Sequence, residues 1–165
     1  MRSVAVLFAF LIVCGSFAEA ATPQSATTRL AALFARDWEM RKVLSPEYAA
    51  QLGDTRFQDR WDDLSLRGIE RAHHYERSVL AELKMIPLAE LSSADKLNVE
   101  LFRRGYETSI AEYGFRRWLA PIAYNGGLQT AADLAELLPF ESLKNYQDWL
   151  ARIRAFELAP TRPPR

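Results

Sequence analysis

The sequence predicts an all-α protein, and three observations support that fold class. Apolar side chains recur at three- and four-residue intervals along most of the chain, which is the spacing of one helix face. Serine residues precede several of these runs, where they can act as helix N-caps. No alternating strand pattern is present, and Asn125-Gly126 lies between predicted helices rather than between strands. We therefore expect a multi-helix bundle or array in which one helical layer packs on another.

The first twenty residues have the three parts of a secretory signal peptide. Arg2 gives a positively charged start, residues 4–17 form a run of small and apolar residues, and Ala18-Glu19-Ala20 is a small-x-small cleavage site. The apolar run is shorter than the roughly 20 residues that span a bilayer as a permanent helix. We expect cleavage after Ala20 and a secreted or periplasmic product that begins at Ala21.

The only cysteine, Cys14, lies inside this leader, so the mature chain would form no internal disulfide. Cleavage before Cys14 would give a lipoprotein, but Val13 stands where such signals usually have a small residue, and we favour the first interpretation. The net charge is zero, and it stays zero once Arg2 and Glu19 leave with the leader. Nucleic acids and anionic membrane surfaces attract a clustered basic field, so neither is predicted as a partner.

The first helix of the mature chain is predicted over residues 28–43, with Thr27 and Thr28 as possible N-caps. Its apolar positions follow helical spacing: Leu30, Leu33, Phe34 and Trp38. A second, short helix should follow, capped by Ser45.

In this second helix Pro46 occupies the first turn, where its missing N–H costs no hydrogen bond. Gly53 is expected to end it. The next stretch, Gly53 to Leu64, is polar and aromatic without a period, and we predict an ordered loop. Its four aspartates could in principle hold calcium: Asp54, Asp59, Asp62 and Asp63. Their spacing is not that of an EF-hand, and Arg56 and Arg60 interleave with them, so we favour salt-bridged loop packing.

Two longer helices are expected next. Ser65 can cap a helix that runs to about Lys84, with apolar positions Leu66, Ile69, Leu80 and Leu83. Ser92, three residues before an acid, is a capping signal for a helix that carries Leu97, Leu101 and Phe102. Gly105 in the middle of that helix costs about 1 kcal/mol relative to alanine, so we expect a neighbouring helix to approach closely there.

A loop is predicted over residues 121–127, and Thr130 then begins a short helix that stops at Pro139. Glu141 or Ser142 opens the last helix, whose apolar stripe is Leu143, Tyr146, Trp149, Leu150 and Ile153.

The helical region of the mature chain is therefore expected over residues 21–155. Residues 156–165 contain three prolines and no apolar face, so they should not continue the helix. They are either a disordered tail or the product of a frameshift or premature end in a longer gene, and we favour the second explanation.

No catalytic, cofactor-binding or metal-ligating residue can be assigned from motifs. His73 and His74 are adjacent on a predicted helix, about 100° apart around its axis, which is too splayed to chelate one metal. Glu70-x-x-His73 matches half of a carboxylate-bridged di-metal motif, but the second half is missing. Gly126-Gly127 lacks the strand that precedes a phosphate-binding loop and is interpreted as a turn. Neither a His-Glu-x-x-His nor a Gly-x-Ser-x-Gly motif occurs.

Three groups of motifs nevertheless follow one another in a distinctive order. The first comprises Leu44-Ser45-Pro46-Glu47, Gln51-Leu52-Gly53-Asp54 and Phe57-Gln58-Asp59-Arg60-Trp61-Asp62-Asp63-Leu64-Ser65. The second is Leu91-Ser92 with Ala94-Asp95-Lys96-Leu97, and the third is Tyr146-Gln147-Asp148-Trp149-Leu150-Ala151-Arg152-Ile153. Together they resemble the opening helices of the bacterial domain of unknown function family 885, which usually has Arg at the position of Lys96. The likeness covers about residues 28–154.

This resemblance implies an all-helical, often exported protein several times this length, similar to zinc metallopeptidases of the glutamate-zincin type. The His-Glu metal-binding helix of that family lies far downstream of any residue here, so no ligand carries over to this sequence, and zinc is implied only for the full-length family. The chain would be an exported N-terminal fragment of a metallopeptidase-like hydrolase, inactive by itself. The loop from Gly53 to Ser65 is either one wall of the family's substrate cleft or a structural element, and we favour the structural role.

The alternative is a self-contained periplasmic helical binding or interaction module. It predicts that the four tryptophans belong to a closed core: Trp38, Trp61, Trp118 and Trp149. The fragment interpretation instead predicts an apolar helix face left without a partner, and hence possible self-association.

Overall fold

The computed structural model describes residues 24–119, 122–123 and 126–158, and it is all-α, as predicted. The expected signal peptide, its cleavage site and the lipidation candidate Cys14 lie outside the described residues, as do residues 159–165 of the expected tail. Among the helices that are described, none is both long and apolar enough to cross a membrane.

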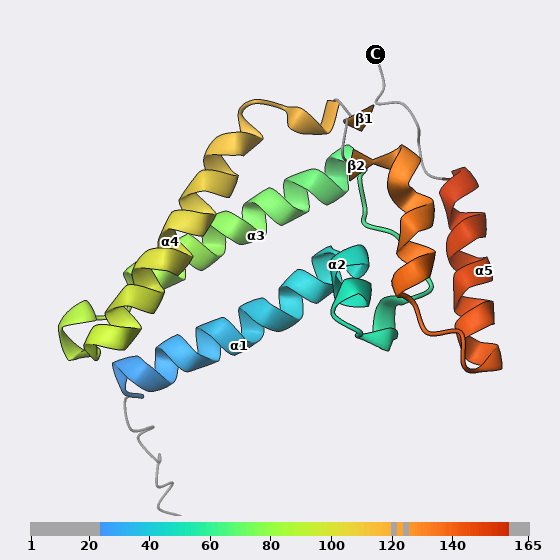
Figure 1. Cartoon of the computed structure of the whole chain (residues 1–165). Helices are drawn as coiled ribbons and strands as arrows, with labels where there is room; N and C mark the ends of the chain where they lie inside the picture. Colours follow the sequence, from blue (N-terminus) through green and yellow to red (C-terminus); the bar gives the residue numbers. More distant parts are fainter. Residues whose placement is uncertain (1–23, 120–121, 124–125, 159–165) are drawn as a thin grey trace, which may run out of the picture.

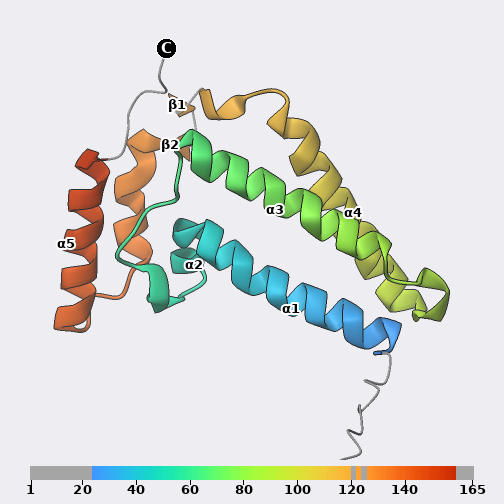
Figure 2. The same cartoon turned by 180° about the vertical axis from the view of Figure 1, so that it is seen from behind.

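Three long helices form the first part of the molecule: α1 (Ala26–Leu44), α3 (Leu66–Lys84) and α4 (Ser93–Tyr113). The helices α3 and α4 pack against each other, and α1 lies beside α3 (Figures 1 and 2). A short 3₁₀ helix, η2 (Leu88–Glu90), lies in the connection between α3 and α4. The shared core of these helices contains Ala26, Leu30, Leu33, Val79, Leu80, Leu83, Ile86, Leu91, Val99 and Tyr106.

The second part is built around a smaller apolar cluster. Its elements are α2 (Pro46–Gln51), η1 (Thr55–Phe57), η4 (Leu128–Leu137) and α5 (Leu143–Leu158). Ala50 of α2 packs with Leu134 and Leu138, and Trp61 and Trp149 cover them. Figures 1 and 2 show η4 and α5 side by side, with α2 between them and the end of α1.

Serine side chains cap the N-termini of several helices. The predicted caps at Ser65 and Ser92 are confirmed, since their hydroxyls accept from the backbone N–H of Gly68 and Asp95, both at 3.1 Å. Ser142 opens the last helix by accepting from the N–H of Asn145.

The start of α1 differs from the prediction. Its N-cap is Ser25, whose hydroxyl accepts from the N–H of Thr28, so both threonines proposed as caps lie inside the helix. The threonines stand closer to the apolar run, but the helix begins two residues earlier than predicted, and its first residue, Ala26, is buried in the core.

Three further expectations need correction. After η3 (Arg117–Leu119), the strands β1 (Ile122–Ala123) and β2 (Gly126–Gly127) pair antiparallel, so a minimal hairpin exists where only a turn was expected. The next helix, η4, begins two residues before Thr130 and is a 3₁₀ helix. The last helix runs to Leu158, past the predicted end at residue 155.

The expectation that a neighbouring helix approaches Gly105 closely is also wrong. A Cβ atom built at Gly105 would meet no heavy atom within 4 Å, among the residues described, so this glycine borders open space. The helices pack on the face of α4 that carries Val99 and Tyr106, and Gly105 stands beside that face.

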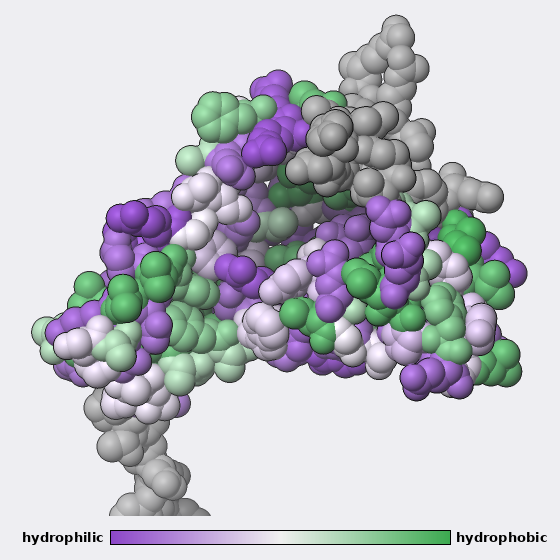
Figure 3. All heavy atoms as spheres, viewed as in Figure 1, coloured by the Kyte–Doolittle hydropathy of each residue, from purple (hydrophilic) through white to green (hydrophobic). Residues whose placement is uncertain are grey.

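Two apolar surfaces remain uncovered in the described part of the chain. On α5 the exposed fractions are 73% for Leu143, 53% for Tyr146, 49% for Leu150 and 43% for Ile153. On α4, Leu97 and Leu101 are 60% and 61% exposed. Figure 3 shows apolar side chains gathered over α5 and over the start of α4.

Candidate functional site

Aspartate side chains of the loop from Gly53 to Ser65 hold it in place through ion pairs and hydrogen bonds. Three of its aspartates form ion pairs: Asp54 with Arg56 and Lys42, Asp59 with Arg60, and Asp63 with Arg71. The hydrogen bond from Arg56 holds the pKa of Asp54 well below its ordinary value, and Arg60 lowers the pKa of Asp59 in the same way. The predicted salt-bridged packing is confirmed for these three aspartates.

The fourth aspartate, Asp62, accepts two hydrogen bonds at the N-terminus of α2. Its Oδ1 accepts from the N–H of Glu47 at 2.9 Å, and its Oδ2 accepts from the hydroxyl of Ser45 at 2.6 Å. Ser45 is the N-cap residue of α2, as predicted, but its hydroxyl makes no cap hydrogen bond to the backbone of that helix. Burial raises the pKa of Glu47, and the nearby charge of Asp62 raises it further.

Arg152 of α5 fixes this loop to the last helix, a role that the sequence analysis did not predict although its third motif group contains the residue. The residue is fully buried, its Nη2 donates to the carbonyl oxygen of Phe57 at 2.8 Å, and its own carbonyl accepts from Trp61 Nε1 at 2.7 Å. The guanidinium carbon lies 5.2 Å from the Trp61 ring centroid, within cation–π distance. Burial lowers the pKa of Arg152, while Glu47 and Asp62 oppose that shift. The sequence signal was its place in the third motif group, beside an apolar stripe, which gave no information on its contacts with the loop.

Gly68, in the first turn of α3, is the tightest contact of the loop. A Cβ atom there would lie 2.2 Å from the backbone oxygen of Asp63 and 2.5 Å from its Cγ. Only glycine therefore allows the end of the loop to cross the first turn of α3 at this distance.

The two histidines do not form a metal centre in the described residues. The ring of His73 stacks on Tyr113, with centroids 3.7 Å apart and an interplanar angle of 13°, whereas His74 is exposed. No group of three or more His, Cys, Asp or Glu side chains suited to a metal ion is found in the part of the chain that the structure describes. His73 is thus half-buried against an aromatic side chain, a contact that its spacing in the sequence did not predict.

A buried carboxylate lies among α1, α3 and α4. Asp37 is 3% exposed, and its Oδ1 accepts from the hydroxyls of Tyr75 and Tyr106, while its Oδ2 accepts from Arg41 Nε at 2.9 Å. Burial and the charge of Asp37 raise the pKa of Tyr75 to about 12, and burial also raises the pKa of Tyr106. Burial favours a lower pKa for Arg41, but the hydrogen bond to Tyr106 and the charge of Asp37 outweigh it. The phenols therefore stay protonated donors, and the guanidinium stays charged.

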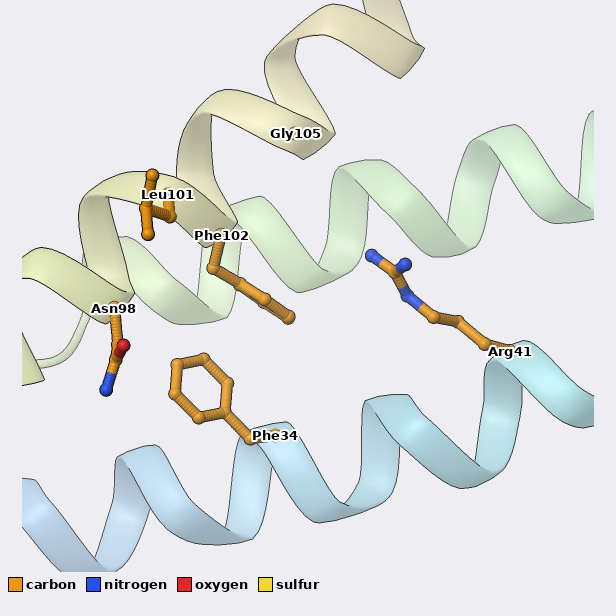
Figure 4. A pocket seen from close by; sticks show the side chains of 6 residues that line it. All are labelled: Phe34, Arg41, Asn98, Leu101, Phe102 and Gly105. Atoms are coloured by element: carbon orange, nitrogen blue, oxygen red, sulfur yellow. The ribbon is translucent and has the colours of Figure 1, made fainter. Parts of the chain in front are cut away.

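An open pocket of about 460 Å³ lies above this cluster, between α1 and α4. Figure 4 shows its lining residues, Phe34, Arg41, Asn98, Leu101, Phe102 and Gly105. The rings of Phe34 and Phe102 have centroids 4.7 Å apart, and Arg41 reaches toward them from α1. The described residues that line the pocket combine one cation, Arg41, and one amide, Asn98, with apolar side chains.

Comparison with known proteins gives one match. Residues 46–160 match the family model described as a bacterial protein of unknown function, DUF885. The matched residues include the loop, Arg152 and the pocket wall on α4. No curated protein and no solved structure matches the chain. Because the family model covers well over half of the sequence, the chain belongs to this DUF885 family of bacterial proteins.

Proposed function

We propose that the chain is the N-terminal helical part of an exported, metallopeptidase-like hydrolase and that it supplies a scaffold rather than catalytic groups. The observation that carries this proposal is the outward face of α5, which lies inside the family-matched span. Four large apolar side chains are between 43% and 73% exposed there: Leu143, Tyr146, Leu150 and Ile153. Monomeric soluble proteins rarely leave such a stripe uncovered, and a further helical segment of a larger fold would bury it.

The chemistry of the loop supports a scaffold role. Its aspartates are engaged in ion pairs or in closing the start of α2, and Arg152 holds the loop against α5. Side chains with such fixed partners orient neighbouring helices, and they would have to give up those partners before they could bind a metal or a substrate.

The test is to purify the mature chain, measure its zinc content and assay it with a library of fluorogenic peptides. We expect no stoichiometric zinc and no cleavage, and we expect the DNA beyond codon 165 to encode helical sequence with a His-Glu motif in one frame. One tightly bound metal ion per chain, or peptide cleavage, would contradict the proposal. Substitution of His73 and His74 would then locate the metal.

The export component rests on the leader sequence and has its own test. Expression in a bacterium should yield a secreted or periplasmic product whose intact mass corresponds to a start at Ala21. A product that begins at an acylated Cys14, or one that retains Met1, would overturn this component without affecting the scaffold proposal.

The second candidate, a self-contained periplasmic binding module, is favoured by the pocket between α1 and α4. Against it, the four tryptophans do not form the closed core that it predicts: Trp38 is 46% exposed, and Trp61, Trp118 and Trp149 are half-buried. Light scattering and binding of an apolar dye separate the two candidates. Self-association with dye binding supports the scaffold, whereas a monodisperse monomer that binds no dye supports the module.

A further inference from the structure

The pocket between α1 and α4 combines one cation with apolar walls. Among the described residues that line it, Arg41 alone is charged, and Phe34, Leu101 and Phe102 are large and apolar. Small-molecule sites typically have this composition, with few polar groups that fix orientation and a volume of about 300 to 1,000 Å³. We propose that this pocket binds a small apolar carboxylate, a proposal that does not depend on the hydrolase assignment.

The geometry of Arg41 presents an open edge to such a ligand. Its Nε is occupied by Asp37 at 2.9 Å and by the Tyr106 hydroxyl at 3.3 Å, which fixes the plane of the guanidinium. Its Nη1 and Nη2 atoms make no hydrogen bond to any described residue, and 47% of the side chain is exposed. Figure 4 shows the guanidinium directed toward Phe102. A carboxylate can therefore pair with both terminal nitrogens, which is the bidentate geometry that arginine favours.

The apolar part of the ligand would lie along α4. Leu101 is 61% exposed, and a Cβ atom added at Gly105 would have no heavy atom of the described residues within 4 Å. A mid-helix glycine costs about 1 kcal/mol relative to alanine. No described helix approaches Gly105, so closer helix packing does not offset this cost. An alkyl or aromatic group of a ligand would instead fit in the open space beside Gly105.

The buried charge of Asp37 limits the affinity. Asp37 is the nearest carboxylate to Arg41 and partly neutralises it, so a second carboxylate should bind weakly, with Kd of about 0.1 to 1 mM. Two sources share the required chemistry: the C-terminus of a peptide that ends in an apolar residue, and a free medium-chain fatty acid.

The experiment titrates the mature chain with N-acetyl-leucine and with octanoate, using chemical-shift perturbation, alongside the uncharged N-acetyl-leucinamide and octanol. We expect at least one carboxylate to bind about tenfold more tightly than its uncharged counterpart, because only the carboxylate pairs with Arg41. Binding of only one of them identifies the source. No carboxylate binding at about 10 mM, or equal binding of the uncharged compound, would overturn the proposal.

Two variants at one position test where the ligand binds. Gly105→Leu places a side chain in the open space and should weaken carboxylate binding by about tenfold or more, whereas Gly105→Ala should change it less than about threefold. Neither variant removes a contact of the fold, and thermal unfolding checks that both remain folded. Unchanged affinity in Gly105→Leu would show that the ligand binds elsewhere and would refute the assignment.

Discussion

The two parts of the molecule are stabilised in different ways. The part formed by α1, α3 and α4 has a continuous apolar core with one carboxylate, Asp37, buried inside it. The part formed by α2, η4, α5 and the loop has few buried apolar residues, and Arg152 joins its elements through polar contacts to Phe57 and Trp61. Where apolar burial is small, directional contacts of a few side chains decide which elements pack together.

Removal of Asp37 should have the largest effect. Asp37→Ala leaves the hydroxyl of buried Tyr106 and that of Tyr75 without their acceptor and should lower the free energy of unfolding by about 4 kcal/mol. Hydrogen exchange should then be faster throughout α1, α3 and α4. Asp133→Ala, at an exposed position, is the control, with a change within about 0.5 kcal/mol. Protection that stays high in α3 would show that the apolar core alone is sufficient.

Removal of Arg152 should act locally. Arg152→Ala creates a cavity and removes the hydrogen bond to Phe57, at a cost of about 3 kcal/mol. We expect faster hydrogen exchange in α5 and the loop and unchanged exchange in the α3 and α4 pair. The matched control is Arg154→Ala on the exposed side of the same helix. Loss of protection in α3 as well would mean that the two parts unfold as one unit.

The same substitution at two glycines should give opposite signs. Gly68→Ala forces the backbone of Asp63 away from α3 and should destabilise the protein by about 2 kcal/mol, although alanine is the better helix former. Gly105→Ala meets no neighbour among the described residues and should stabilise it by up to about 1 kcal/mol. Denaturant unfolding of both variants measures the difference. Two stabilising substitutions would show that the loop adapts to the added methyl group.

The smallest effect should depend on pH. The pKa of Glu47 is raised in the folded state, so its charge opposes folding above that pKa, and the penalty disappears below the ordinary value of 4.5. Glu47→Gln should therefore add up to about 1 kcal/mol near pH 7 and nothing below about pH 4.5. Glu39, whose pKa is lowered by Lys42 and Arg56, is the opposite case. Glu39→Gln should reduce stability at neutral pH, and the loss should vanish as the pH falls below 4.5.

Local features of the fold were predictable, and long-range ones were not. Ser65 and Ser92 cap helices through contacts three residues away, which a short window of sequence contains. The hydrogen bond at the N-terminus of α2 was not predictable in this way, because its acceptor, Asp62, lies 15 residues after Glu47 in the sequence.

The candidate sites show the same limit. Periodicity located the apolar stripe of α5, but the burial of Arg152 depends on a loop 95 residues earlier. At Gly105 the sequence marked an unusual position, but the predicted close helix contact was wrong. Helix propensity carries no information about which face of a helix its partner packs on.

The contacts of Arg152 also determine the order in which the chain can fold. The hairpin of α3 and α4 forms between segments that are close in sequence, whereas the bonds of Arg152 to Trp61 and Phe57 close loops of 91 and 95 residues. Closing such long loops costs more chain entropy, and contacts at large sequence separation slow folding. The helical hairpin should therefore form early, and α5 should dock late, in a step whose rate Arg152→Ala would change without affecting the formation of the hairpin.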